Sequence, residues 1–397
     1  MDKPFRIAYV VIILAPLVLA LPFAMDVYVP ALPSMSKLFR VDAGEMQLTL
    51  TIFMFTAGVI QLFVGPLTDH FGRKPVAYIT ILLFAIGSFL CAIAQNPIQL
   101  ILYRIVQASG SCGMLVIAYA IIRDLYHGEQ GGKAYSYLNG IIAFSPMFAP
   151  FIGSFLDIYL GWPATFLFLL VVALVALLCL RLGLPETLAP EKKQRFQLSI
   201  FKEYVSIFRN RLFLWYTLAT AAGVSYLYLF CAMSSYIIIR LLHISEAYYG
   251  FYFAFMGVSF FVGSMLSGWL IGKIGIYYAC VLGFCLTLLG GVIMMAWYYQ
   301  TGLTINNFIW PMLLIGIGGT ICLGAGSGGS MEPFGNTAGA AAALGGGFRF
   351  LFMALVGSVA ITSHISSTLP LAVPAVIFSV IGLIIFLSKK STLRFRH

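Results

Sequence analysis

The segment Gly65-Pro-Leu-Thr-Asp69-His-Phe-Gly72-Arg73-Lys74 lies between two long apolar runs near the N-terminus. It gathers charges in a chain of which only 9% of the residues are charged. Gly65 and Gly72 allow helix ends to approach closely, while the acid and the two bases can form ion pairs at a membrane surface. The segment therefore predicts a tight, charge-stabilised loop between two membrane-spanning helices.

The composition indicates that most of the surface faces lipid. Hydrophobic residues make up 61% of the chain, and soluble domains carry about a quarter charged residues. A helix crosses a bilayer with about 20 apolar residues. Twelve such runs predict an all-α polytopic membrane protein with transmembrane helices at about 7–27, 46–67, 75–94, 98–121, 135–156, 163–183, 212–238, 247–271, 275–298, 308–330, 338–362 and 369–388.

The positions of the basic residues predict the orientation. Of the 23 Lys and Arg residues, only Lys37, Arg40 and Arg240 fall opposite the N-terminal side, while Arg104 and Arg349 lie within spans. Cytoplasmic loops accumulate basic residues, so both termini are expected in the cytoplasm of a bacterial cell, with the chain in its inner membrane. The net charge of +10 is spread over juxtamembrane loops, which argues against nucleic-acid binding.

The N-terminal run and the cysteines exclude other classes. Lys3 and Arg6 precede an apolar run of about 19 residues without a clean cleavage site, so an uncleaved first helix is expected rather than a signal peptide. The seven cysteines lie inside spans without a Cys-x-x-Cys spacing, and the five histidines are scattered. We expect no disulfide framework, no metal site and no cofactor.

A hydrophilic segment divides the spans into two sets of six. It predicts an N-terminal bundle at 1–184, a cytoplasmic linker at 185–210 and a C-terminal bundle at 211–397. A shift of 203 residues suggests a duplicated unit, although chance recurrence among 39 glycines is the alternative. The shift maps Arg6, Gly65, Leu67 and Gly72 onto Arg209, Gly268, Leu270 and Gly275, while Asp69, Arg73 and Lys74 become Gly272, Ile276 and Tyr277.

Three ionisable residues are expected within the membrane. Asp26 ends the first span ahead of two prolines, and a carboxylate at that depth can gain and lose a proton. The alternative is an interfacial acid that marks the helix end. Gln107 follows Arg104 by one helical turn. Because arginine keeps its charge, Arg104 must face a water-filled cavity or an acid, unless its side chain extends to the outer membrane surface. Arg349 is expected to line a cavity between the membrane-spanning helices, or else to pair with backbone carbonyls.

The fifth span carries Phe144-Ser-Pro146-Met-Phe-Ala-Pro150-Phe-Ile-Gly153-Ser154. Each proline removes a backbone hydrogen bond and bends the helix, and Gly153 allows a neighbouring helix to approach. These residues alone predict a kinked helix and do not by themselves indicate a function.

These motifs together resemble the major facilitator superfamily over essentially the whole chain. The segment of residues 65–74 is similar to the signature loop between its second and third helices. The segment Arg104-Ile-Val-Gln107-Ala-Ser-Gly110 is similar to its fourth-helix motif, with Ala108 in place of the usual glycine. Asp-Val-Tyr-Val-Pro-Ala-Leu-Pro after position 25 and the fifth-span motif, with Ser154 replacing a second glycine, resemble the drug-proton antiporters.

Further matches point to the bicyclomycin-resistance branch of that group. They are Trp162-Pro-Ala-Thr-Phe166, Leu184-Pro-Glu-Thr-Leu188 and Gly345-Gly-Gly-Phe-Arg349-Phe. The resemblance implies two pseudo-symmetric six-helix bundles that alternate access to a central site. It also implies that Asp26, Arg104 and Gln107 take part in proton coupling.

The resemblance further implies a conformational latch on the cytoplasmic side, built from Gly65, Asp69, Gly72, Arg73, Lys74 and Asp124. Arg73 would pair with Asp124. Asp69 would then sit against the N-terminus of the eleventh helix near Asn336-Thr337-Ala338-Gly339, and the latch would hold only while the cytoplasmic side is closed.

The expected function is a proton-coupled transporter, acting as a monomer in the lipid bilayer, that exports small molecules or drugs. Candidate cavity residues are Arg349, Tyr28, Tyr119, Tyr226 and Tyr236. The alternatives are a metabolite or siderophore transporter and a non-transporting receptor. No enzyme is expected, since Gly324-Ala-Gly326-Ser-Gly-Gly329 fits a dinucleotide pattern but follows no strand.

Overall fold

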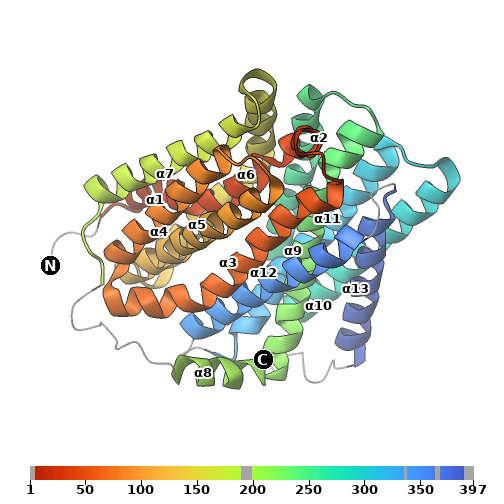
Figure 1. Cartoon of the computed structure of the whole chain (residues 1–397). Coiled ribbons are helices and arrows are strands. Elements are labelled where there is room, and N and C mark those ends of the chain that lie inside the picture. Colours follow the sequence, from red (N-terminus) through yellow and green to blue (C-terminus); the bar gives the residue numbers. More distant parts are fainter. Residues whose placement is uncertain (1–4, 189–198, 335–337, 363–366, 389–397) are drawn as a thin grey trace.

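The computed structural model describes residues 5–188, 199–334, 338–362 and 367–388 (Figure 1). All regular elements within these ranges are helices. Eleven of the described helices are long and apolar enough to cross a membrane. One of them, α10 (Glu246–Thr301), has 56 residues and is broken by non-helical backbone at Gly275. It therefore supplies two crossings, which confirms the expected twelve spans.

The first bundle contains six spanning helices and a short helical segment at the end opposite the N-terminus (the outer end). That segment comprises η1 (Val29–Ala31) and α2 (Leu32–Phe39). The spanning helices are α1 (Ile7–Asp26), α3 (Ala43–Phe71), α4 (Arg73–Ala92), α5 (Pro97–Leu125), α6 (Gly128–Leu160) and α7 (Pro163–Gly183).

The second bundle repeats this arrangement with α9 (Arg211–Ser235), which continues as the π-helix η3 (Tyr236–Leu241), and with α10, α11 (Ile305–Met331), α12 (Ala338–Thr362) and α13 (Leu369–Ser388). The linker contributes α8 (Ser199–Phe208), which lies along the lower edge of the molecule in Figure 1. Some of the helices start where a polar side chain accepts backbone N–H groups. Asp42 caps α3, Asn96 caps α5 and Asn210 caps α9.

Gly72 and Gly275 occupy equivalent turns in the two bundles. Gly72 has φ 106° and ψ 160° between α3 and α4, and Gly275 has φ 81° and ψ 165° within α10. Only glycine adopts such a conformation at low cost. The 203-residue shift that relates them in sequence therefore also relates two turns of the same backbone shape, which supports duplication over chance.

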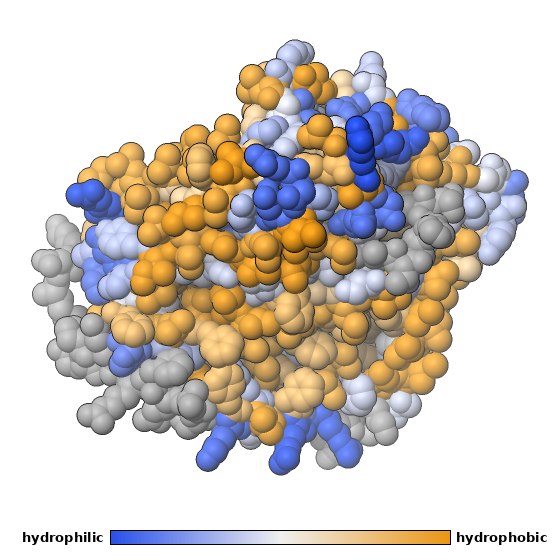
Figure 2. All heavy atoms as spheres, in the orientation of Figure 1, coloured by the Kyte–Doolittle hydropathy of each residue, from blue (hydrophilic) through white to orange (hydrophobic). Residues whose placement is uncertain are grey.

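The outer surface of the helices is apolar, as a lipid-facing surface requires. Figure 2 shows a broad hydrophobic belt across this face, with hydrophilic side chains gathered toward its upper and lower ends. Large apolar side chains in the belt regions are exposed, among them Ile12, Leu102, Leu178 and Val359. Polar groups are instead drawn into the protein interior, where Arg104 is completely buried.

The two bundles meet along α3 with α12 and along α6 with α10. Small residues bring these helices into close contact: a Cβ added at Gly58 would lie 2.9 Å from the Leu351 nitrogen, and one at Gly257 would lie 2.6 Å from Met147 Cγ. At the outer end, Tyr236 donates to the Leu32 carbonyl at 3.3 Å. The outer ends of the bundles are thus tied together in this conformation.

Candidate functional site

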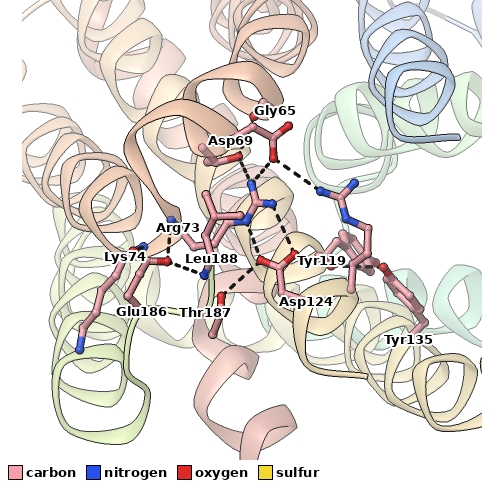
Figure 3. A network of polar contacts seen from close by, with 12 residues as sticks. Gly65, Asp69, Arg73, Lys74, Tyr119, Asp124, Tyr135, Glu186, Thr187 and Leu188 are labelled. Atoms are coloured by element: carbon pink, nitrogen blue, oxygen red, sulfur yellow. Dashed lines mark hydrogen bonds and ion pairs between the residues drawn. The ribbon is translucent and has the colours of Figure 1, made fainter. Parts of the chain in front are cut away.

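The charged loop forms a network at one end of the first bundle (Figure 3). The Arg73 side chain is only 3% exposed. Its Nε donates to Asp124 Oδ2 at 2.8 Å, and its Nη1 donates to Asp69 Oδ1 at 2.6 Å and to Thr68 Oγ1 at 2.8 Å. The expected pair of Arg73 and Asp124 is present, and a buried arginine with this many partners rigidifies the ends of α3, α4 and α5.

Asp69 does not lie free of Arg73 as expected. Its carboxylate accepts from Arg73 and lies 3.7 Å from Arg123 Nη2. Arg123, not Asp69, lies near the start of α12, where a Cβ added at Gly339 would be 3.1 Å from Arg123 Nη1. Residues 336 and 337 of the expected contact fall outside the described residues. Arg73 holds Asp69 because one guanidinium can serve two carboxylates at once.

The observed network therefore differs from the expected latch in the bundles that its charged residues connect. Asp69, Arg73 and Asp124 all belong to the first bundle, and within the described residues Arg123 is the charged side chain of this network that lies against the second. The network also forms while the outer ends of the bundles are hydrogen-bonded, so its presence is not confined to an outward-open molecule.

Glu186 completes the network, and sequence reasoning assigned it no role. Its carboxylate accepts the backbone N–H groups of Arg73 and Lys74, both at 3.0 Å, and that of Leu188 at 2.9 Å. Although burial raises the pKa of Glu186, these backbone donors outweigh it and lower the pKa below its usual value. Lys74 Nζ in turn donates to the Leu184 carbonyl at 2.6 Å. Glu186 thereby caps α4.

Gly65 and Gly72 have different surroundings. Nothing lies within 4 Å of a Cβ added at Gly65, whereas one at Gly72 would lie 2.7 Å from Glu186 Oε2. The positive φ and the close carboxylate both require glycine at position 72, while space alone would allow a side chain at position 65.

Arg104 lies fully buried in the first bundle. Its Nη1 donates to the Ala24 carbonyl at 2.8 Å and to Gln107 Oε1 at 2.7 Å. The guanidinium carbon lies 4.4 Å from the ring centroid of Tyr28 and 4.1 Å from that of Phe53, and aromatic faces stabilise a cation. Its Nε and Nη2 have no hydrogen-bond partner among the described residues. Two donors of a permanent cation are thus left for water or a ligand.

Asp26 lies at the interface between the bundles and is 5% exposed. Its Oδ1 accepts the Cys231 thiol of α9 at 3.6 Å. Over the described part of the chain it forms no salt bridge. Arg104 binds the carbonyl of Ala24, two residues before Asp26, so Arg104 and Gln107 lie beside the same end of α1 as Asp26, although no contact joins Asp26 to either side chain among the described residues.

The fifth-span motif supports this region. Pro146, Pro150 and Gly153 lie within α6, and a Cβ added at Gly153 would overlap the Val27 carbonyl. The lack of a side chain at Gly153 therefore allows α6 to contact the end of α1 at Val27, the residue after Asp26.

A small pocket with hydroxyl side chains and one arginine in its lining lies within the second bundle. It has a volume of about 150 Å³, and its lining comprises Thr217, Thr220, Ser327, Ser330, Met331, Ala342, Gly345, Gly346 and Arg349. Tyr119 of α5 is close enough to Arg349 for the two to interact electrostatically. A larger groove of about 450 Å³ on the outside of α10 is lined by apolar, tyrosine and cysteine side chains and carries no charged group in its described lining.

The candidate tyrosines are distributed among different surroundings. Tyr28 OH is 2.7 Å from Thr49 Oγ1 beside Arg104, and Tyr119 OH donates to Asn139 Oδ1 at 2.5 Å. Tyr236 binds the Leu32 carbonyl across the bundle interface. Tyr226 is buried inside the second bundle with its ring 6.4 Å from Phe378, and it is absent from the lining of the Arg349 pocket.

Twelve helical crossings in two equivalent bundles, with ionisable groups buried at and near their interface, define a membrane transporter. The family model described as "Major Facilitator Superfamily" matches residues 14–358. The chain belongs to that superfamily and is a multi-pass membrane protein.

Related sequences cover most of the chain. It is 29% identical to a chloramphenicol resistance protein of Pseudomonas aeruginosa over 86% of this chain and 80% of the relative. It is 28% identical to multidrug resistance protein D of Escherichia coli over 85% and 84% of the two chains. It is 25% identical to a bicyclomycin resistance protein homologue of Haemophilus influenzae over 88% of each. These relatives confirm the resemblance to the drug-efflux branch.

The fold is similar to that of a bacterial homologue of the human lysosomal transporter Spinster. The crystal structure of its inward-facing, occupied conformation gives a TM-score of 0.75 at 17% identity, covering 100% of both chains. The inward-facing, unoccupied conformation gives a TM-score of 0.70 at the same identity. At 17% identity this similarity shows a shared fold and does not extend to substrate or mechanism.

We predict that Glu186→Gln lowers the free energy of unfolding by about 0.5–2 kcal/mol, as loss of a helix cap does. Because folding lowers the pKa of Glu186, its stabilisation is full above its usual pKa of 4.5 and is lost as the pH falls through the lower folded value. The difference between wild type and variant should therefore shrink below about pH 4.5.

Denaturant unfolding in detergent between pH 3.5 and 7 measures this difference. Glu203→Gln is the control, because Glu203 accepts no hydrogen bond among the described residues and should change little. A Glu186→Gln variant as stable as wild type at pH 7 would show that the carboxylate does not cap α4.

Proposed function

We propose that the chain is a proton-coupled exporter of small molecules, including drugs, in the bacterial inner membrane. The observation that carries the proposal is Asp26, a buried carboxylate at the bundle interface with a thiol donor and no ion pair among the described residues. The names of the related bacterial resistance proteins support drugs as substrates.

The surroundings of Asp26 suit proton exchange. An ionised carboxylate is costly to bury without a cation, whereas a neutral acid is not. The closed outer side therefore favours protonated Asp26. Opening that side would break the Cys231 contact and admit water, so Asp26 could take up a proton from the outer medium there. Release of this proton toward the cytoplasm when substrate binds would couple proton entry to export.

This proton exchange would drive alternating access. The proton gradient supplies about 2.3 kcal/mol per charge at 100 mV, which supports roughly a fifty-fold gradient of an uncharged substrate because each 1.4 kcal/mol is about tenfold. The units that move would be residues 1–184 and 211–397 of one monomer, joined by the linker at 185–210. The basic residues support cytoplasmic termini.

We predict that Asp26→Asn abolishes drug uptake driven by a pH gradient into inverted membrane vesicles, because an amide cannot carry the proton. The probe is a radiolabelled drug chosen by a growth screen that begins with chloramphenicol and bicyclomycin. Asp157→Asn is the matched control, since Asp157 accepts from Ser34 at the end of α6 and should retain uptake. Unchanged gradient-driven uptake in Asp26→Asn would remove Asp26 from the mechanism.

The charge network is proposed to stabilise closure of the cytoplasmic side through Arg123, which lies between Asp69 and the start of α12. Asp69→Asn removes the acid that holds both Arg73 and Arg123. Arg123→Gln removes only the side chain that lies against the second bundle, so it separates the two effects. Both variants should increase the population open to the cytoplasm.

Spin labels at His127 and Lys273, in a background with Cys179 and Cys285 replaced by serine, measure this population by pulsed distance spectroscopy. We expect a larger share of long distances in Asp69→Asn and Arg123→Gln. Lys133→Gln is the control for loss of a nearby charge. Distance distributions identical to wild type in both variants would contradict the latch.

A further inference from the structure

The pocket around Arg349 lies about midway along α12, and with cytoplasmic termini, as proposed, it would lie toward the cytoplasmic half of the second bundle. Arg349 is about eleven residues into α12, which corresponds to about 16 Å along the helix axis. The hydrocarbon core is about 30 Å thick. Thr217 and Ser330, on the opposite walls, are near the ends of α9 and α11 that face the same side as the start of α12. A solute entering from the cytoplasm would reach this pocket early.

The Arg349 guanidinium is held weakly by the protein. Among the described residues, its Nη1 donates to Ser327 Oγ at 3.4 Å, which is near the limit for such a bond. It forms no ion pair with any described acid. The acid beside the pocket, Glu332, is exposed at the end of α11 and does not approach Arg349 closely enough to pair with it. A permanent cation in the membrane interior is thus uncompensated.

The walls of the pocket offer further donors. Thr217 is 3% exposed, and its Oγ1 has no hydrogen-bond partner among the described residues. Ser327 accepts from Arg349, which leaves its own proton available to a ligand. By contrast Thr220 and Ser330 donate to backbone carbonyls, those of Tyr216 and Ser327. One cation and two hydroxyl groups can therefore converge on a single acceptor group.

The first bundle closes this pocket. A Cβ added at Gly346 would overlap the side-chain amide of Gln61 from α3, and Gln61 Oε1 is buried without a partner among the described residues. Movement of the bundles against each other would change this wall. Access to Arg349 is therefore linked to the conformational cycle.

We propose that this pocket binds the carboxylate of an organic anion among the transported substrates, with Arg349 as its charge partner and Thr217 and Ser327 as hydrogen-bond donors. The planar fork of arginine matches a carboxylate in two parallel hydrogen bonds. A volume of about 150 Å³ is below the roughly 300–1,000 Å³ of a site for a whole drug-sized molecule. The pocket therefore holds the anionic head group, and the rest of the substrate lies between the bundles. This inference rests on the proposed transport function for its physiological meaning.

The test compares two probes of nearly equal shape, N-acetylphenylalanine and N-acetylphenylalanine amide, by calorimetric titration of the purified full-length protein. Wild type should bind the carboxylate at least about tenfold more tightly than the amide, because a buried charge-assisted hydrogen bond is lost with the amide. Equal affinities would overturn the proposal without any variant being made.

Variants then assign the preference to the pocket. Arg349→Gln should bring the two affinities within about twofold of each other, Arg349→Lys should restore part of the preference, and Thr217→Val should reduce it about threefold. Lys273→Gln removes a positive charge elsewhere in the same bundle and should keep the full preference. A preference that survives in Arg349→Gln would contradict the role of Arg349.

Inorganic phosphate is the third probe. Phosphate that binds to wild type as tightly as the carboxylate would assign the pocket to free inorganic anions and overturn the organic-substrate proposal. The titration needs no proton gradient, so its outcome is independent of the vesicle assay. Failure of gradient-driven transport with an intact carboxylate preference would reject the proposed function alone.

Discussion

A charge buried away from water must be solvated by protein groups, and this constraint separates the buried arginines by role. Arg73 is surrounded by Asp69, Asp124 and Thr68, so its charge is compensated and its contribution is structural. Arg104 has one carbonyl, one amide and two aromatic faces, with two donors left open. Arg349 has one long hydrogen bond. The less a cation is satisfied by its own protein, the more its position depends on water, a proton carrier or a substrate.

The same constraint governs the interface between the bundles. Asp26 is buried there against the Cys231 thiol of the other bundle, and Gly153 seats the adjoining end of α1. At the end of the molecule that carries the linker, α8 contacts both bundles, since Tyr204 OH donates to the Leu62 carbonyl of α3 and Phe208 packs against Phe348 of α12. Contacts between bundles thus include close glycine approaches, individual hydrogen bonds, aromatic pairs and apolar side-chain packing. Such contacts can separate at modest cost, which a rocking motion requires.

The sequence was sufficient for features that depend on local composition. Apolar runs predicted the twelve crossings, and the 203-residue shift paired Gly72 with Gly275, whose turns have the same backbone shape in the structure. The pairing of Arg73 with Asp124 followed from the family resemblance. What could not be predicted depends on contacts between distant segments. Glu186 contacts α4 although more than a hundred residues of sequence separate them, and 205 residues separate Cys231 from Asp26. No pattern in the sequence around Glu186 or Cys231 indicates these partners. The sharing of Asp69 between Arg73 and Arg123 likewise depends on side-chain geometry.

The account depends on Asp26 exchanging its proton when substrate is bound. The direct measurement is the number of protons released into weakly buffered detergent solution when a transported drug is added to the purified protein, followed with a pH-indicator dye near neutral pH. The account predicts about one proton per bound drug molecule for wild type and none for Asp26→Asn, which should still bind the drug. Drug binding to wild type without proton release, or equal release from Asp26→Asn, would contradict it.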